Sequence, residues 1–289
     1  MPDPTPVTAG WYALIAIFGL VFGSFINVVI YRLPKRLHYV WQQDCREFLG
    51  KDAAPASDTT PPPGIVFPAS HCPHCKHPIR PQHNIPVLSY LFLRGRCADC
   101  GTPIGMRYPV VEILTAIVTC VVIWRFGLTP SGIAAIVLSY ALLALAFIDY
   151  DHQLLPDDIT FPGIWLGLSC NLFSMFTSLS SAVIGAVAGY LVLWLVYHVF
   201  RLVTGKEGMG YGDFKLLAML GAWLGWQALP AIIILAAGVA SMLGIGMIVS
   251  KKLSRDTPVP FGPFLAAAGW LVLIWGYVVL PKFLPFLYR

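Results

Sequence analysis

The sequence predicts an all-α polytopic membrane protein with about eight transmembrane helices and a small cytoplasmic zinc-binding loop domain. Three observations lead to this fold class: the apolar composition, the number of long apolar runs, and a polar loop with two cysteine pairs. Hydrophobic residues make up 57% of the 289 residues and charged residues 11%, whereas charged residues form about 25% of a soluble domain. The mean hydropathy is +0.72. A soluble fold of this length could not bury so much apolar surface.

Eight apolar runs define the predicted spans, because about 17 to 25 apolar residues cross a bilayer. The sixth run, which follows Asp213, is shorter than the others. The first run is expected to be a helix of the mature chain. A cleavable signal peptide has basic residues before its apolar run, and here Arg32, Lys35 and Arg36 follow it. The runs lie near residues 11–31, 109–126, 131–149, 159–176, 182–200, 214–226, 229–249 and 260–280.

The distribution of Lys and Arg predicts the orientation, since basic residues gather on the cytoplasmic side of membrane proteins. Ten lie in 32–107, three in 201–215 and three in 251–258, so eight spans place sixteen of the nineteen on one side. This orientation makes 1–31 the first span, 32–107 a cytoplasmic domain and 108–289 a transmembrane bundle, with both termini periplasmic. The basic residues are spread over loops without interleaved aromatic residues, so nucleic acid is not an expected partner.

The loop 32–107 combines two compositions. Residues from about 50 to 70 are rich in Pro, Ala, Ser and Thr and predict a flexible linker. Two Cys-x-x-Cys pairs follow, and such paired spacing is typical of a closed, structural zinc site of four thiolates. Disulfides are the alternative, but they rarely persist in the cytosol. The predicted ligands are Cys72, Cys75, Cys97 and Cys100, with three nearby histidines as rival ligands, His71, His74 and His77.

Three acidic residues, Glu112, Asp149 and Asp213, lie within or at the ends of the predicted spans, where a charge is costly unless it is paired or functional. Asp149 ends the third run, Asp213 precedes the sixth, and eight spans place both aspartates on the same face. Two carboxylates held close share a proton, so that one acts as a base and the other polarises a carbonyl group, as in aspartic proteases. Gly210 and Gly212 would let a substrate backbone approach. The alternative is that Asp213 is the N-cap of a helix.

Further carboxylates surround this predicted pair. Asp157 and Asp158 follow Pro156 at the expected start of a helix, where acidic residues are favoured. Together with Asp151 and Glu207 they would form an acidic rim that attracts a basic peptide. Simple stabilisation of the helix start is the alternative.

Two other classes of function account for part of these features. A proton-coupled transporter would use acidic residues within the membrane as a relay. A zinc-bearing membrane scaffold would use the aspartates only as helix caps. A transporter gives no reason for both aspartates to lie at one membrane face beside a glycine-rich loop, and a cleavage assay distinguishes the scaffold from a peptidase.

Five motifs in a fixed order cover nearly the whole chain: residues 23–34, the two Cys-x-x-Cys pairs, 107–112, 148–157 and 210–215, the last reading Gly210-Tyr211-Gly212-Asp213-Phe214-Lys215. This ordered set resembles the type IV prepilin peptidases, which are bifunctional leader peptidases and N-methyltransferases of the GxGD class of membrane aspartyl proteases.

The resemblance implies that Asp149 and Asp213 are catalytic. The residues predicted to support the substrate are Gly210, Gly212, Lys215, Asp157 and Asp158. It implies a multi-pass protein of the bacterial inner membrane that cuts the basic leader of type IV prepilins and pseudopilins on the cytoplasmic side, serving type IV pili or type II secretion. S-adenosylmethionine would then methylate the new N-terminal amine. Gly95 matches a position linked to methylation, although a turn of the second cysteine pair explains it equally well. The sequence leaves the methyl-donor site unplaced.

Overall fold

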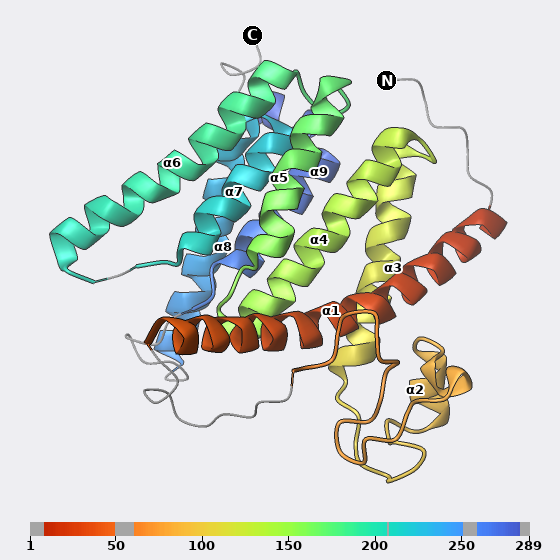
Figure 1. The fold of residues 1–289 in the computed structure, drawn as a ribbon. Coiled ribbons are helices and arrows are strands. Elements are labelled where there is room, and N and C mark those ends of the chain that lie inside the picture. The colour runs from red at the N-terminus through yellow and green to blue at the C-terminus, as the bar shows by residue number, and fades with distance from the viewer. Residues whose placement is uncertain (1–8, 50–60, 207, 251–258, 284–289) are drawn as a thin grey trace. The chain divides into compact units, whose positions relative to one another are not determined.

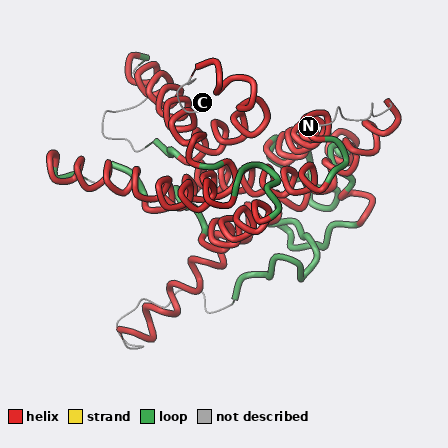
Figure 2. Tube along the Cα trace, turned by 90° about the horizontal axis from the view of Figure 1, so that it is seen from above, coloured by secondary structure: helices red, strands yellow, loops and turns green. Residues whose placement is uncertain are grey.

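The computed structural model describes residues 9–49, 61–206, 208–250 and 259–283. Helices form the regular structure of these residues, which contain no strand, and the predicted all-α fold class is confirmed. Figure 2 shows the helices in red with loops between them. Part of the predicted linker, the basic loop 251–258 and the rim residue Glu207 lie outside the described residues.

The chain divides into two compact units, Met1–Trp124 and Arg125–Arg289. The first, called unit 1, is built from α1 (Ala9–Leu49), η1 (Pro81–Asn84), α2 (Leu88–Phe92) and most of α3 (Arg107–Phe126). The second, called unit 2, comprises α4 (Pro130–His152), α5 (Asp157–Leu172), α6 (Leu179–Thr204), α7 (Tyr211–Leu224), η2 (Trp226–Ala228), α8 (Leu229–Val249) and α9 (Gly262–Phe283).

Each predicted span contains a helix of the described chain. Five helices among these residues are long and apolar enough to cross a membrane, and a shorter apolar stretch, Gly262–Gly276, lies in α9. The chain is therefore a multi-pass membrane protein. The five are Gly10–Leu49, Arg107–Phe126, Pro130–His152, Leu179–Thr204 and Trp226–Met247.

Helix α1 is longer than its apolar run. It has 41 residues and includes Pro34, whereas the predicted span ends at residue 31. The run records where the apolar side chains stop, and the polar residues that follow still favour a helix. Within unit 1, α1 packs closely on α3, because a Cβ atom on Gly23 would lie 2.6 Å from the Cα atom of Glu112.

Helix α7 is enclosed by α5, α6 and α9 in unit 2 (Figure 1). All eight residues from Leu216 to Trp223 are buried. A helix surrounded by other helices is apolar on every side, and it does not need the length of a helix that faces lipid. This position explains why the sixth apolar run is short.

Glycines bring the backbones of α6 and α7 together. A Cβ atom on Gly185 would lie 2.4 Å from the carbonyl oxygen of Gly221, and one on Gly189 would lie 2.6 Å from that of Leu217. Such close approach of small residues is a common way for helices to associate in membranes. It holds α7, and the aspartate in its first turn, in a defined position.

The other end of α7 is fastened by Asn171. Its buried side-chain amide donates to the carbonyl oxygens of Ala222 (2.9 Å) and Trp223 (3.0 Å). Its side-chain oxygen accepts the N–H groups of Phe176 and Thr177. These bonds satisfy carbonyl groups that a helix end leaves without partners.

Candidate active site and candidate metal centre

The two aspartates lie together in unit 2. Asp149 is in the last turn of α4 and Asp213 in the first turn of α7, and each is only 6% exposed. The negative charge of Asp149 acts on the carboxyl group of Asp213. Residues 64 positions apart in the chain thus form one buried carboxylate pair, as the sequence predicts.

Asp149 is held by the start of another helix. Its Oδ2 atom accepts the N–H group of Gly262 at 2.9 Å, and Gly262 is the first residue of α9. The N-terminus of a helix carries a partial positive charge, which offsets the unfavourable place of Asp149 at the C-terminal end of α4. A Cβ atom on Gly262 would lie 2.6 Å from Asp149 Oδ2, so this contact requires glycine.

Gly262 was not among the predicted site residues. The sequence indicates a helix start at this point, because the dipeptide Gly262-Pro263 follows a loop. The pattern alone does not show which side chain the new helix faces.

Asp213 does more than stabilise the start of its helix. The N-cap of α7 is Gly210, so the alternative prediction that Asp213 is the N-cap is wrong. Asp213 accepts the Gly210 N–H group, as the acidic residue of a capping box does. Its Oδ1 atom is buried and, among the described residues, has no hydrogen-bond partner. Such an atom costs about 1–3 kcal/mol, and a purely structural cap gives no reason for that cost.

The two loop glycines differ in their surroundings. A Cβ atom on Gly212 would lie 2.7 Å from the Cβ atom of Leu155, so Gly212 packs against the loop before α5. A Cβ atom on Gly210 would meet nothing closer than the Gly212 nitrogen at 4.0 Å. The space beside the Cα atom is therefore open at Gly210 and filled by Leu155 at Gly212.

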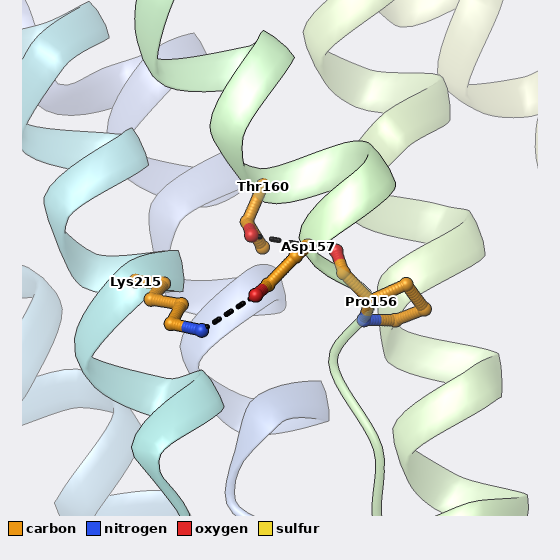
Figure 3. Close-up of polar contacts among 4 residues, drawn as sticks. All are labelled: Pro156, Asp157, Thr160 and Lys215. Atoms are coloured by element: carbon orange, nitrogen blue, oxygen red, sulfur yellow. Dashed lines mark hydrogen bonds and ion pairs between the residues drawn. The ribbon is translucent and has the colours of Figure 1, made fainter. Parts of the chain in front are cut away.

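Lys215 and Asp157 form an ion pair beside this site (Figure 3). Lys215 Nζ donates to both carboxylate oxygens of Asp157, at 2.7 and 2.8 Å, and thereby links the N-terminal parts of α5 and α7. The side chains are 23% and 50% exposed, so the pair contributes about 1 kcal/mol or less to stability. Within the predicted acidic rim, the charge of Asp157 is compensated, whereas Asp158 is exposed on the same helix turn.

The four predicted metal ligands form one cluster in unit 1. The Sγ atoms of Cys72, Cys75, Cys97 and Cys100 all lie within 4.8 Å of one another, and those of Cys72 and Cys100 are 3.8 Å apart. A tetrahedral zinc ion with Zn–S bonds of about 2.3 Å needs sulfur atoms about 3.8 Å apart. The cluster therefore fits a closed four-thiolate site.

The two cysteine loops, called the first and second knuckle, repeat the same hydrogen bonds. Cys72 donates its N–H to His77 and accepts that of Lys76, while Cys97 donates to Thr102 and accepts from Gly101. The side-chain and backbone hydrogen bonds of Thr102 lower the pKa of Cys100 to about 6, whereas desolvation and the neighbouring thiol groups raise the pKa of Cys75 to about 11. A low pKa favours the thiolate, which is the form that binds a metal.

Gly95 precedes the second knuckle in a left-handed turn, with φ of +67°. Its N–H donates to Tyr90 O at 2.8 Å, and its carbonyl oxygen accepts the N–H of Ile104 at 2.7 Å. A Cβ atom on Gly95 would lie 2.8 Å from the Tyr90 hydroxyl oxygen. The glycine is thus required both by the turn and by the neighbouring ring.

Comparison with known proteins gives matches along nearly the whole chain. The family model described as "Bacterial Peptidase A24 N-terminal domain" matches residues 17–126, and that described as "Type IV leader peptidase family" matches residues 136–247. No solved structure matches.

Several curated relatives are similar over more than nine tenths of both chains. A protein of Aeromonas hydrophila is 51% identical over 266 residues, covering 92% of this chain and 91% of its own. Proteins of Pseudomonas aeruginosa and Stutzerimonas stutzeri are 51% and 50% identical over 270 residues. Each alignment covers 93% of this chain and 92% of the relative. All three are named "Prepilin leader peptidase/N-methyltransferase".

Proposed function

Because this chain belongs to the type IV leader peptidase family, we propose that it removes the basic leader of type IV prepilins and pseudopilins and then methylates the new N-terminal amine. The observation that carries the peptidase activity is the buried pair of Asp149 and Asp213. The names of its relatives support both activities.

Asp149 acts as the general base in this proposal. Both aspartates accept one backbone N–H group, Asp149 from Gly262 and Asp213 from Gly210, so the buried oxygen atom without a partner decides between the two roles. Asp213 holds the proton that two adjacent carboxylates share, and its Oδ1 atom has no competing partner among the described residues.

Peptide cleavage then follows from these two roles. Asp149 takes a proton from water as the water oxygen bonds to the scissile carbonyl carbon, and Asp213 gives its proton to the carbonyl oxygen. Collapse of the tetrahedral intermediate returns a proton to Asp213 and breaks the C–N bond. The leaving amine takes the proton held by Asp149, so both carboxyl groups regain their starting states.

The zinc assignment rests on the cysteine cluster. Its four thiolates fit a zinc ion that stabilises the knuckles and leaves no open position for water. For methylation, S-adenosylmethionine would supply an electrophilic methyl group from its sulfonium, and the new N-terminal amine would accept that group and give up one proton.

The orientation also belongs to this proposal. The sixteen basic residues on one side support an inner-membrane protein with a cytoplasmic catalytic face and periplasmic termini. Residues 32–107 form the cytoplasmic domain between the first span and the catalytic bundle 108–289.

Purified protein and a synthetic prepilin test the assignment. We expect Asp149→Asn and Asp213→Asn each to slow leader removal by about 10²-fold or more while zinc stays bound. Asp44→Asn is the matched control, because Asp44 is an exposed aspartate of α1. Normal processing by either single variant would exclude the pair as the catalytic centre. A proton relay would instead predict proton movement without cleavage by the native protein.

A further inference from the structure

A cavity of about 260 Å³ lies within unit 1. It is near the size of small-ligand pockets, roughly 300–1,000 Å³. Three segments enclose it: the middle of α1, the first turns of α3, and the region of the two knuckles and α2. The peptidase chemistry proposed for unit 2 does not use this cavity.

One face of α1 forms the first wall. The lining residues Ser24, Asn27, Val28, Tyr31 and Arg32 recur at helical spacing. The polar groups of this wall are fixed, since Asn27 Nδ2 donates to Tyr108 O at 3.0 Å. Arg32 is buried, and its guanidinium donates to three carbonyl oxygens, those of Gly64, Pro68 and Ala69.

A buried carboxylate closes the cavity from α3. Glu112 is 7% exposed; it accepts the N–H of Val87 at 2.8 Å and a hydrogen bond from Ser24. Val87 has φ of +60° and ψ of −50°, and Leu88 N–H donates to Pro86 O at 2.6 Å. This is the rare γ-turn, which is strained for a β-branched residue. Strain of this kind is often found at ligand sites.

The lining suits a ligand that has a flat ring and a positive charge. Tyr31, Tyr90 and Tyr108 are among the lining residues, and tyrosine rings offer faces for stacking or for a cation; Lys35 Nζ already lies 3.5 Å from the centroid of the Tyr31 ring. The lining includes the carboxylates of Glu112 and Asp99, whereas its only guanidinium, that of Arg32, already donates to backbone carbonyls.

We propose that this cavity is the binding site for the methyl donor, S-adenosylmethionine. The tyrosine rings hold the adenine ring, and Glu112 accepts hydrogen bonds from the donor's polar, cationic side. The inference rests on the methylation activity proposed above and gives it a place in the fold. The donor then lies in unit 1, whereas the peptidase aspartates lie in unit 2.

The cavity gives Gly95 a physical role. Gly95 does not line the cavity, but its α-hydrogens leave room for the ring of Tyr90, which does. A Cβ atom there would lie 2.8 Å from the Tyr90 hydroxyl oxygen and 2.9 Å from Cζ, and it would push the ring. Gly95 is therefore a positioning residue that acts through Tyr90.

The zinc site supports the same cavity. The first cysteine of each knuckle, Cys72 and Cys97, is among its lining residues. A bound zinc ion would thus hold two walls of the cavity in place without contacting the donor's reacting atoms.

Binding of S-adenosylhomocysteine, the demethylated donor, tests the role of Glu112. The full-length zinc-loaded protein is titrated calorimetrically in detergent. Glu112→Gln keeps an acceptor for Val87 but removes the carboxylate, and we expect it to raise Kd about 10-fold or more. Glu47→Gln makes the same chemical change on the exposed end of α1 and should leave Kd unchanged. Native affinity in Glu112→Gln would overturn the assignment.

Gly95→Ala tests the role of Tyr90 and has a matched control. Gly95 and Gly101 both take positive φ, +67° and +69°, so alanine strains both turns equally. Only at Gly95 does the added Cβ atom meet another residue within 4 Å. We expect Gly95→Ala to weaken binding about 10-fold more than Gly101→Ala. Equal losses of affinity in the two variants would show that Gly95 serves only the turn, and would contradict its proposed role in positioning Tyr90.

Hydrogen exchange of the native protein locates the site without any substitution. S-adenosylhomocysteine should protect amides in 84–90 and 104–112, while leader cleavage by the same sample shows that the protein is intact. Protection confined to unit 2 would overturn the cavity assignment, even if every variant misfolded. If the native protein cuts prepilin but neither binds the donor nor methylates the product, the proposed methylation itself is wrong.

Discussion

Each unit holds a buried carboxylate that accepts a backbone N–H group, but the other surroundings of the carboxylates differ between the units. In unit 1, Glu112 receives hydrogen bonds from Val87 and Ser24. In unit 2, Asp149 and Asp213 each receive one, from Gly262 and Gly210, but Asp213 Oδ1 has no partner among the described residues. A carboxylate with its donors in place is suited to hold a ligand. A close pair with a free acceptor is suited to move protons. The two proposed activities should therefore fail separately.

Removal of zinc should have the largest effect, and on unit 1. Structural zinc contributes about 10–16 kcal/mol to small zinc-binding peptides, so the knuckles should unfold in a Cys72→Ser, Cys97→Ser variant. We expect loss of about one zinc ion per chain and no detectable binding of S-adenosylhomocysteine, with a smaller loss of leader cleavage. Metal analysis, calorimetry and the cleavage assay measure these three quantities. Full donor binding without zinc would contradict the scaffold role.

Substitution of either aspartate should have the opposite effect, with cleavage lost and donor binding kept. Each single Asp→Asn variant should slow cleavage by about 10²- to 10⁴-fold, with donor affinity unchanged. Because two residues that act as one unit are not additive, the double variant should be little slower than either single variant. Single-turnover cleavage rates measure this coupling. Multiplied losses in the double variant would indicate independent roles.

Gly262→Ala should disturb the pair without removing a carboxylate. The new Cβ atom would lie 2.6 Å from Asp149 Oδ2, so the carboxylate must shift, and a displacement near 1 Å can cost about 10²-fold in rate. Cleavage kinetics measure the effect. Gly238→Ala is the control, since a Cβ atom there meets nothing within 4 Å. Equal rates for the two variants would show that the Gly262 contact does not position Asp149.

Neutralising the acidic rim should have the smallest effect. Asp158→Asn removes an exposed charge, and we expect the apparent KM for a basic leader to rise about 2- to 5-fold at low salt, with the difference lost at high salt. Asp157→Asn should also break the ion pair with Lys215 and lower the melting temperature slightly. Cleavage at two ionic strengths and thermal unfolding measure both effects. A KM that does not depend on salt would contradict the acidic rim and would indicate that Asp158 only stabilises the start of α5.

Features that depend on the order of residues within one segment could be predicted from that segment. The apolar runs predicted the helices, and the paired cysteine spacing predicted the cluster that Cys72 and Cys100 help to form. Contacts between distant stretches were not predictable in the same way. Gly262 meets Asp149 across 113 residues, and Lys215 meets Asp157 across 58. Neither contact leaves a periodic or spacing signal, because each depends on how the helices pack.

The cavity in unit 1 shows the same limit. Glu112 was recognised as an unusual acidic residue near a span, but the strained turn at Val87 and the ring of Tyr90 beside Gly95 carry no local signal of a ligand. The aspartate pair was an exception among long-range contacts. The count of spans predicts both residues at one face of the membrane, and the structure brings their carboxyl groups near each other.

The backbone contact between Gly185 and Gly221 limits how α7 can slide. A shift by one turn would carry Asp213 about 5.4 Å along the helix axis, and it would bring side chains into the place where these two glycines now meet. Gly221 lies eight residues, about 12 Å, from Asp213. Because α6 is long and apolar enough to cross a membrane, the contact fixes the position of Asp213 along a helix of that kind. Under the proposed function, the enzyme would choose its cut by height above the membrane core as well as by leader sequence.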